Sequence, residues 1–292
     1  MAALRSMVPV VALVLLSACA QRPGGVAAAT TVSTQASTVA PVEPAAGAGG
    51  LVFRVEYTGG FLAPPDIANR IPLVSVYEDG RVITQGPVPA IYPGPALPSL
   101  QVRRVGPDRV RALVARALAA DVAGSSDLGR PAIADLPTTR FILVTAGLTH
   151  VRDVYALAET SPAGSRFTSQ QLATRTRLQG LLDSLADPGR GDTEQYTPTA
   201  VAVIARNWVD PRDHLAHPAV RWPGPPLPGT AIAGLPGADC VTASESQAQA
   251  VLTAAGNATR TTPWTTADGA RWSIGFRPML PDETGCTDLA VR

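Results

Sequence analysis

The stretch "LVSVYEDGRVITQG" (residues 73–86) gives the clearest indication of the fold. Two runs rich in β-branched residues flank Asp79-Gly80, a dipeptide that favours a tight turn between antiparallel strands. The stretch therefore predicts a β-hairpin. Residues 51–57 and 97–105 have a similar strand-like composition, so we expect the hairpin to belong to a larger antiparallel sheet.

A helix is expected after these strands, starting at Pro107 and stopping near Gly124. Proline suits the first helical turn, and glycine commonly follows the last. Apolar residues recur at spacings of three and four and predict one buried face: Val110, Leu113, Val114, Ala117 and Leu118. The arginines between them are interpreted as a solvated face.

The same order then recurs. Residues 138–157 are expected to form two strands around Ala146-Gly147, and residues 168–189 a helix that begins with a capping box of Thr168 and Gln171. A hairpin followed by a helix, twice over, predicts an α+β fold: an antiparallel sheet built from hairpins, with helices packed on one face.

The last third of the chain, residues 191–292, is expected to form a smaller α+β unit that packs on the domain of residues 51–190, with a shared sheet as one arrangement. Residues 199–208 read as a strand and residues 264–276 as a second Asp-Gly hairpin. Residues 244–256 read as a helix, with Ser244 and Gln247 as another capping pair.

The N-terminus has the layout of a secretory signal: a positive charge at Arg5, an apolar run over residues 8–16, then small residues. The run is shorter than the roughly 20 residues that a membrane-spanning helix needs. Residues 16–19, Leu-Ser-Ala-Cys, resemble a bacterial lipobox. The resemblance implies that residues 1–18 are a signal peptide and that the Cys19 sulfur carries a diacylglycerol with fatty acyl chains such as palmitate. The alternative is an ordinary secretory signal with an accidental cysteine.

Residues 19–50 are predicted to be a lipidated, disordered tether. They consist mainly of Ala, Thr, Ser, Pro and Gly and contain no aromatic residue, so they bury too little surface to offset the entropy of ordering. The expected location is the outer face of the cytoplasmic membrane. The chain contains Arg but no Lys and is rich in Ala, Pro and Gly; in this bias and in its layout it resembles actinobacterial lipoproteins of uncharacterised activity, a resemblance that implies no site residues.

With Cys19 assigned to lipid, Cys240 and Cys286 are left as an even pair. Disulfides persist in an exported protein, so we predict a bond between them that staples the C-terminal part; two free thiols are the alternative.

The charge balance argues against nucleic acid as a partner. The chain has 24 arginines and 23 acidic residues; removing residues 1–18 removes one arginine and leaves a formally neutral chain without a basic stripe. The expected partners are the membrane, through the diacylglycerol, and an envelope protein or cell-wall ligand. No cofactor is expected.

No phosphate-binding loop, HExxH or GxSxG motif is present. The segment "DPRDHLAH" (210–217) carries the weak metal candidates Asp210, Asp213, His214 and His217. Zinc uses such ligands, but the flanking prolines predict a loop, and a structural or surface role is favoured. The four tryptophans are interpreted as core or loop anchors, with a stacking platform for a sugar or peptide as the alternative.

Two functions follow from these observations. The first is a non-catalytic binding or accessory module of the cell envelope, anchored by lipid. The alternative is an envelope hydrolase that uses the Asp/His loop at 210–217. The absence of catalytic motifs favours the first.

Overall fold

A computed structural model describes residues 49–159, 167–186 and 192–290. The predicted signal peptide, Cys19 and all but the last two residues of the predicted tether lie outside these ranges. The described residues all belong to one compact unit, Pro44–Arg292. No helix among them is long and apolar enough to cross a membrane.

Within the described ranges, seven antiparallel strands form the first sheet, in the order β6-β5-β1-β2-β3-β4-β7. Their bounds are β1 (Leu51–Thr58), β2 (Val74–Tyr77), β3 (Arg81–Gln85), β4 (Leu100–Arg104), β5 (Thr138–Thr145), β6 (Leu148–Tyr155) and β7 (Glu194–Gln195). Two of the three predicted hairpins, β2–β3 and β5–β6, belong to this sheet and are confirmed. The short strand β7 joins this sheet from beyond residue 190, through β4.

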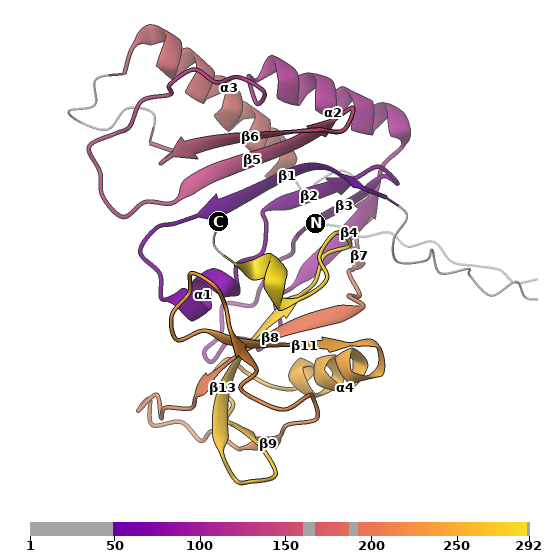
Figure 1. Cartoon of the computed structure of the whole chain (residues 1–292), viewed down its shortest axis with the longest axis vertical. Helices are drawn as coiled ribbons and strands as arrows, with labels where there is room; N and C mark the ends of the chain where they lie inside the picture. Colours follow the sequence, from indigo (N-terminus) through magenta and orange to yellow (C-terminus); the bar gives the residue numbers. More distant parts are fainter. Residues whose placement is uncertain (1–48, 160–166, 187–191, 291–292) are drawn as a thin grey trace, which may run out of the picture. The chain divides into compact units, whose positions relative to one another are not determined.

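Two helices, α2 (Pro107–Ala119) and α3 (Ser169–Ala186), cover one face of this sheet (Figure 1). Strand residues that alternate toward the helices, such as Phe53, Val55 and Phe141, form the core with them. The predicted capping box of α3 is confirmed: the Thr168 amide donates to Gln171 Oε1 at 2.9 Å, and the Gln171 amide donates to Thr168 Oγ1 at 3.2 Å.

Two predictions for α2 were wrong in detail. Leu118 was expected on the buried face but is 46% exposed, since the core contact of the last turn is made by Ala117. The helix ends at Ala119, not near Gly124, because Asp121 adopts a left-handed conformation with φ of 73° that breaks the helical hydrogen bonding.

The other described strands of the last third form a second sheet, in the order β10-β11-β8-β13-β12-β9. The suggestion of a shared sheet therefore holds for the short strand β7 alone. The pairs of the second sheet are antiparallel except β12–β9. The bounds are β8 (Ala200–Asn207), β9 (Val220–Arg221), β10 (Thr230–Ala231), β11 (Asp239–Ser244), β12 (Trp264–Thr265) and β13 (Arg271–Pro278). Trp222 and Trp264 pack against Phe276 in its core, which confirms the core interpretation for these two.

Helix α4 (Glu245–Gly256) covers one face of this second sheet. The capping pair predicted for it is wrong: Ser244 makes no capping hydrogen bond with its side chain. Ser244 is instead the last residue of β11, paired with Ala200, and Glu245 turns the chain directly into the helix with φ of 51°.

The predicted disulfide is confirmed. Cys240 in β11 and Cys286 at the start of the short 3₁₀ helix η1 (Cys286–Leu289) are bonded, with their Cα atoms 5.9 Å apart. The bond encloses α4 and the hairpin of β12 and β13, which confirms the hairpin predicted at residues 264–276, and it ties the C-terminal segment to the second sheet.

The two sheets exchange short segments. Helix α1 (Pro64–Ala68), from the connection between β1 and β2, packs through Ala68 on Ala202 and Ile204 of the second sheet. In return Leu280, which follows β13, packs with Tyr77 on the face of the first sheet that α2 and α3 leave free. This exchange brings residues from distant parts of the chain together, and the candidate site lies there.

Candidate functional site

The loop of residues 210–217 has no helix or strand. The structure brings Asp213 and His217 together, with His217 Nε2 2.8 Å from Asp213 Oδ1. The Tyr92 hydroxyl and the Leu215 amide also donate to Asp213. Desolvation opposes the effect, but these hydrogen bonds lower the pKa of Asp213 to about 2.

The other two candidates do not join this pair. Asp210 Oδ1 accepts a hydrogen bond from the Arg212 amide, a contact that closes a local turn, and His214 sits in a left-handed conformation with φ of 62°. Among the described residues, no group of three or more His, Cys, Asp or Glu side chains could hold a metal ion. The geometry of this loop therefore gives the hydrolase alternative no ligand set.

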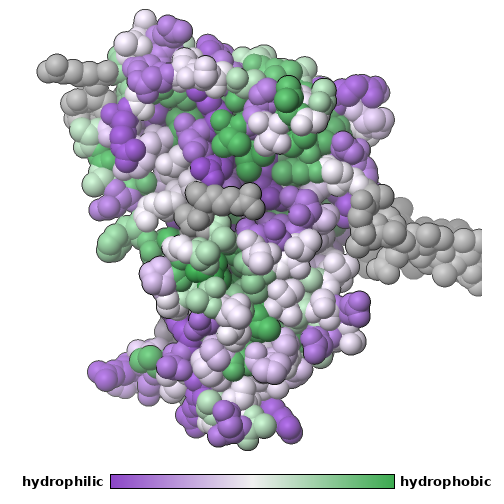
Figure 2. Space-filling view, viewed as in Figure 1, coloured by the Kyte–Doolittle hydropathy of each residue, from purple (hydrophilic) through white to green (hydrophobic). Residues whose placement is uncertain are grey.

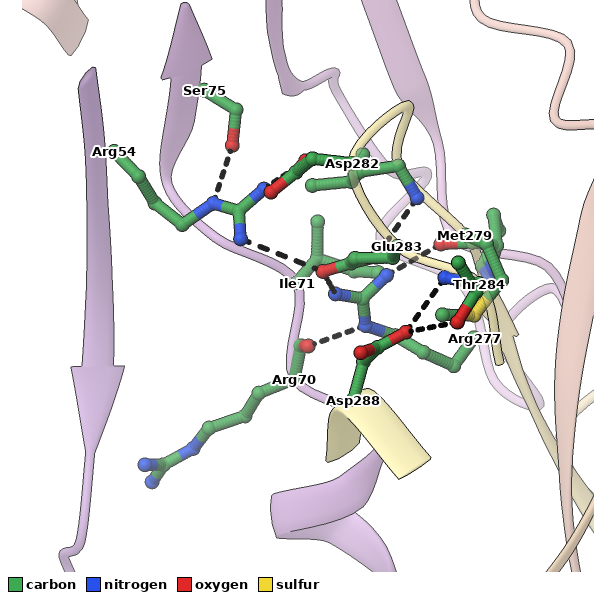
Figure 3. A network of polar contacts seen from close by, with 12 residues as sticks. Arg54, Arg70, Ile71, Ser75, Arg277, Met279, Asp282, Glu283, Thr284 and Asp288 are labelled. Atoms are coloured by element: carbon green, nitrogen blue, oxygen red, sulfur yellow. Dashed lines mark hydrogen bonds and ion pairs between the residues drawn. The ribbon is translucent and has the colours of Figure 1, made fainter. Parts of the chain in front are cut away.

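A buried network that sequence analysis missed joins the two sheets (Figure 3). Arg54 is only 8% exposed; it donates to Ser75 Oγ at 3.0 Å and to Asp282 Oδ1 at 2.7 Å. Arg277 donates to Glu283 Oε1 at 2.8 Å. Each charge has an opposite partner, as buried charges require, so we interpret the network as the clamp that holds the C-terminal segment on the first sheet.

A cleft lies beside this clamp, where α1 meets the second sheet. Arg277 Nε donates to the backbone carbonyl of Arg70 at 2.8 Å, while the Arg70 side chain points away from the network (Figure 3) and lines a cavity of about 580 Å³. This volume is within the range of ligand pockets, about 300–1,000 Å³. Polar and charged side chains line the cavity: Tyr57, Asp66, Asn69, Arg70, Gln85, Arg206, Arg260 and Ser273.

The floor of the cleft depends on Gly275 in β13. A Cβ at this position would lie 1.9 Å from Asn69 Nδ2, a distance that no real contact allows. Asn69 itself caps the end of α1 by donating from Nδ2 to the Pro65 carbonyl at 2.9 Å. Glycine therefore lets the end of α1 approach the strand, and this approach places Arg70 at the cleft.

Three arginines from distant parts of the chain line the cleft. Arg70 follows α1 and donates to the Tyr57 carbonyl at 3.3 Å. Arg206 is near the end of β8, paired with Ser273 across the sheet. Arg260 is held by its own amide, which donates to the Gly94 carbonyl at 3.0 Å.

The charge in the cleft is not balanced by the protein. No described carboxylate lies within 4.0 Å of the guanidinium groups of these three arginines, and Asp66 is the one acidic residue in the lining. Burial lowers the pKa of Arg70, since it removes water from the cation and supplies no counter-charge. An anion in the cleft would relieve this cost.

The three arginines of the cleft could not be recognised from the sequence, because they are far apart in the chain and no spacing links them. Comparison with protein-family models, curated proteins and solved structures found no match. The function is therefore inferred from the residues of this chain alone.

Proposed function

We propose that this protein is a lipoprotein anchored to the outer face of the bacterial cytoplasmic membrane through Cys19, and that its folded part is a non-catalytic binding module for an anionic cell-wall component. The lipobox-like residues 16–19 support the anchor. The observation that carries the binding role is the cleft with three arginines and a single acidic residue.

Guanidinium groups suit an anionic ligand because their paired N–H donors match the two oxygens of a carboxylate or phosphate. The positive charge of the cleft is local, since the chain without residues 1–18 is formally neutral. An anion is therefore drawn to this cleft in particular, and not to the surface as a whole.

The other polar residues of the lining suit a ligand that also carries hydroxyl groups. Asp66, Gln85 and Ser273 offer acceptors and donors for them. Tyr57 is 40% exposed and presents an aromatic ring on which a sugar ring can pack. The ligand class that fits these groups together is an acidic saccharide.

Titration calorimetry of the full chain tests this function with glucuronate, glucose and inorganic phosphate as probes. Glucuronate is expected to bind more tightly than either of the others, since only it carries both a charge and a sugar ring. Arg206→Gln and Arg260→Gln are each expected to weaken binding about tenfold, because the loss of one charge-assisted hydrogen bond lowers the free energy of binding by about that much.

Arg221→Gln is the matched control, because Arg221 is exposed on a strand of the same sheet and does not line the cleft. Equal weakening by this control would show that only overall charge matters. Equal binding of glucose and glucuronate would contradict the proposal.

A further inference from the structure

A second cavity lies on the other face of the first sheet, between α2, α3 and strands β2–β4. Its volume is about 530 Å³. The floor is apolar and is made mainly of Val76, Val82, Val105, Leu113 and Leu185. It has no lining residue in common with the arginine cleft.

The cavity continues along α3. A neighbouring cavity of about 410 Å³ includes the same Arg103, Asp183 and Leu185 in its lining and adds Leu73 and Leu182. The two together form an elongated groove under the edge of the helix layer, with an apolar floor and with polar side chains such as Thr84, Gln101 and Gln179 in its second part. Figure 2 shows hydrophobic residues among hydrophilic ones in the region where Figure 1 places α2 and the strands beneath it.

Arginines stand around the mouth of this groove. Arg103 comes from β4, and Arg109 and Arg116 come from α2. Arg116 donates to the Ser184 hydroxyl. Within the ranges that the structure describes, none of the three pairs with a carboxylate, and Asp183 is the one acidic residue of the lining. Arg109 also lies in the first turn of α2, where the helix dipole adds positive potential.

We propose that this groove binds a single-chain anionic amphiphile, with the acyl chain on the apolar floor and the carboxylate or phosphate at the arginines. An elongated floor suits an alkyl chain because affinity grows with each methylene that leaves water. The three guanidinium groups suit its anionic head. The first cavity of the groove shares no lining residue with the arginine cleft, whereas the neighbouring cavity shares Tyr57 and Gln85 with it. The groove variants tested below lie in the first cavity, so they test this assignment separately from the proposed function.

Titration calorimetry of the full chain with octanoate, decanoate and decanol tests the assignment. Decanoate is expected to bind more tightly than octanoate, by roughly fourfold for each added methylene that is fully buried. Decanol, which has the same chain without the charge, is expected to bind at least about tenfold more weakly than decanoate. A comparison of hexyl phosphate with hexanoate then distinguishes a phosphate head from a carboxylate head.

Two pairs of variants on α2 locate the binding. Arg109→Gln removes a charge at the groove, and Arg111→Gln removes one outside it. Ala112→Trp fills the groove at an exposed lining position, and Ala115→Trp adds the same ring outside it. Arg109→Gln is expected to weaken decanoate binding severalfold and Ala112→Trp by about tenfold or more, with the two controls unchanged.

The result that overturns the proposal is decanoate affinity that survives in Ala112→Trp, or that falls equally in Ala115→Trp. Circular dichroism of each variant verifies that α2 is still folded. Equal affinity for decanol and decanoate would also contradict the proposal, because the arginines would then not bind the anionic head.

Discussion

Two glycines occupy the same place in two Asp-Gly hairpins, and their surroundings differ. Gly80 has φ of 82° and Gly269 has φ of 85°, a conformation that costs other residues about 1–2 kcal/mol. A Cβ at Gly80 would lie 2.2 Å from the Val105 carbonyl oxygen, whereas a Cβ at Gly269 would have no atom within 4 Å. The Asp-Gly dipeptide predicted the turn in both cases, but the close approach at Gly80 depends on Val105, which follows β4 later in the chain.

We therefore predict that Gly80→Ala lowers the free energy of unfolding by at least about twice as much as Gly269→Ala, which should cost about 1 kcal/mol from backbone strain alone. Urea denaturation of the two variants measures the difference. Equal losses would mean that the contact with Val105 does not constrain the turn.

Tyr196 gives a prediction for alkaline pH. Its hydroxyl donates to the Met279 carbonyl at 2.9 Å, and burial raises its pKa to about 12. A raised pKa means that the folded state holds the proton more tightly than the unfolded state does. The contribution of Tyr196 to the free energy of unfolding is therefore fully present below about pH 10 and is lost as the pH rises through 12. Between pH 9 and pH 11 the loss from this group is on the order of 1 kcal/mol. Denaturation at both values should show a smaller loss in Tyr196→Phe than in the wild type, and an equal loss would refute the assignment.

At the scale of elements, local signals predicted most of what the structure contains. The hairpins β2–β3 and β5–β6, helices α2, α3 and α4, and the α3 capping box each rest on residues close in sequence. The errors arose where tertiary structure decides: Ser244 continues a strand up to the first residue of α4, so its side chain does not cap the helix. Helix α1 was missed because its five residues carry little periodicity and it is stabilised by packing on the other sheet.

The disulfide is the strongest covalent constraint on these elements. It joins residues 46 apart in sequence. In the chain-entropy treatment, closing such a loop raises the free energy of the unfolded chain by about 4 kcal/mol. The double variant Cys240→Ala/Cys286→Ala is expected to unfold at a lower urea concentration, by about 2–4 kcal/mol in free energy. The same shift should follow reduction of the wild type, while the reduced double variant should not change. A double variant as stable as the oxidised wild type would contradict this expectation.

At the scale of the whole molecule, the exchange of α1 and the C-terminal segment determines where the cleft lies. Arg70, Arg206 and Arg260 come together only because α1 crosses to the second sheet and Ala96 pairs with Ala258 through their backbones. No property of the separate segments indicates this, so the cleft could not be predicted from sequence. The disulfide could be predicted from sequence, because Cys240 and Cys286 are the two cysteines left once Cys19 is assigned to lipid, and disulfides persist in an exported protein.

The anchor is also tested on the whole protein. If Cys19 receives lipid, a labelled fatty acid supplied to expressing cells will be incorporated into the wild-type chain and not into Cys19→Ser. The wild type should also partition into the detergent phase, since each buried methylene contributes about 0.8 kcal/mol. An unlabelled wild-type chain in the aqueous phase would contradict lipid attachment at Cys19.

The most direct test of the central claim is to map where an acidic saccharide binds. Backbone amide chemical shifts of the isotope-labelled chain, recorded during titration with glucuronate, report this residue by residue. The cleft assignment predicts saturable shifts at Asn69, Arg206 and Ser273, with α4 unaffected. Shifts confined to residues outside the cleft, or no saturable shift at all, would contradict it.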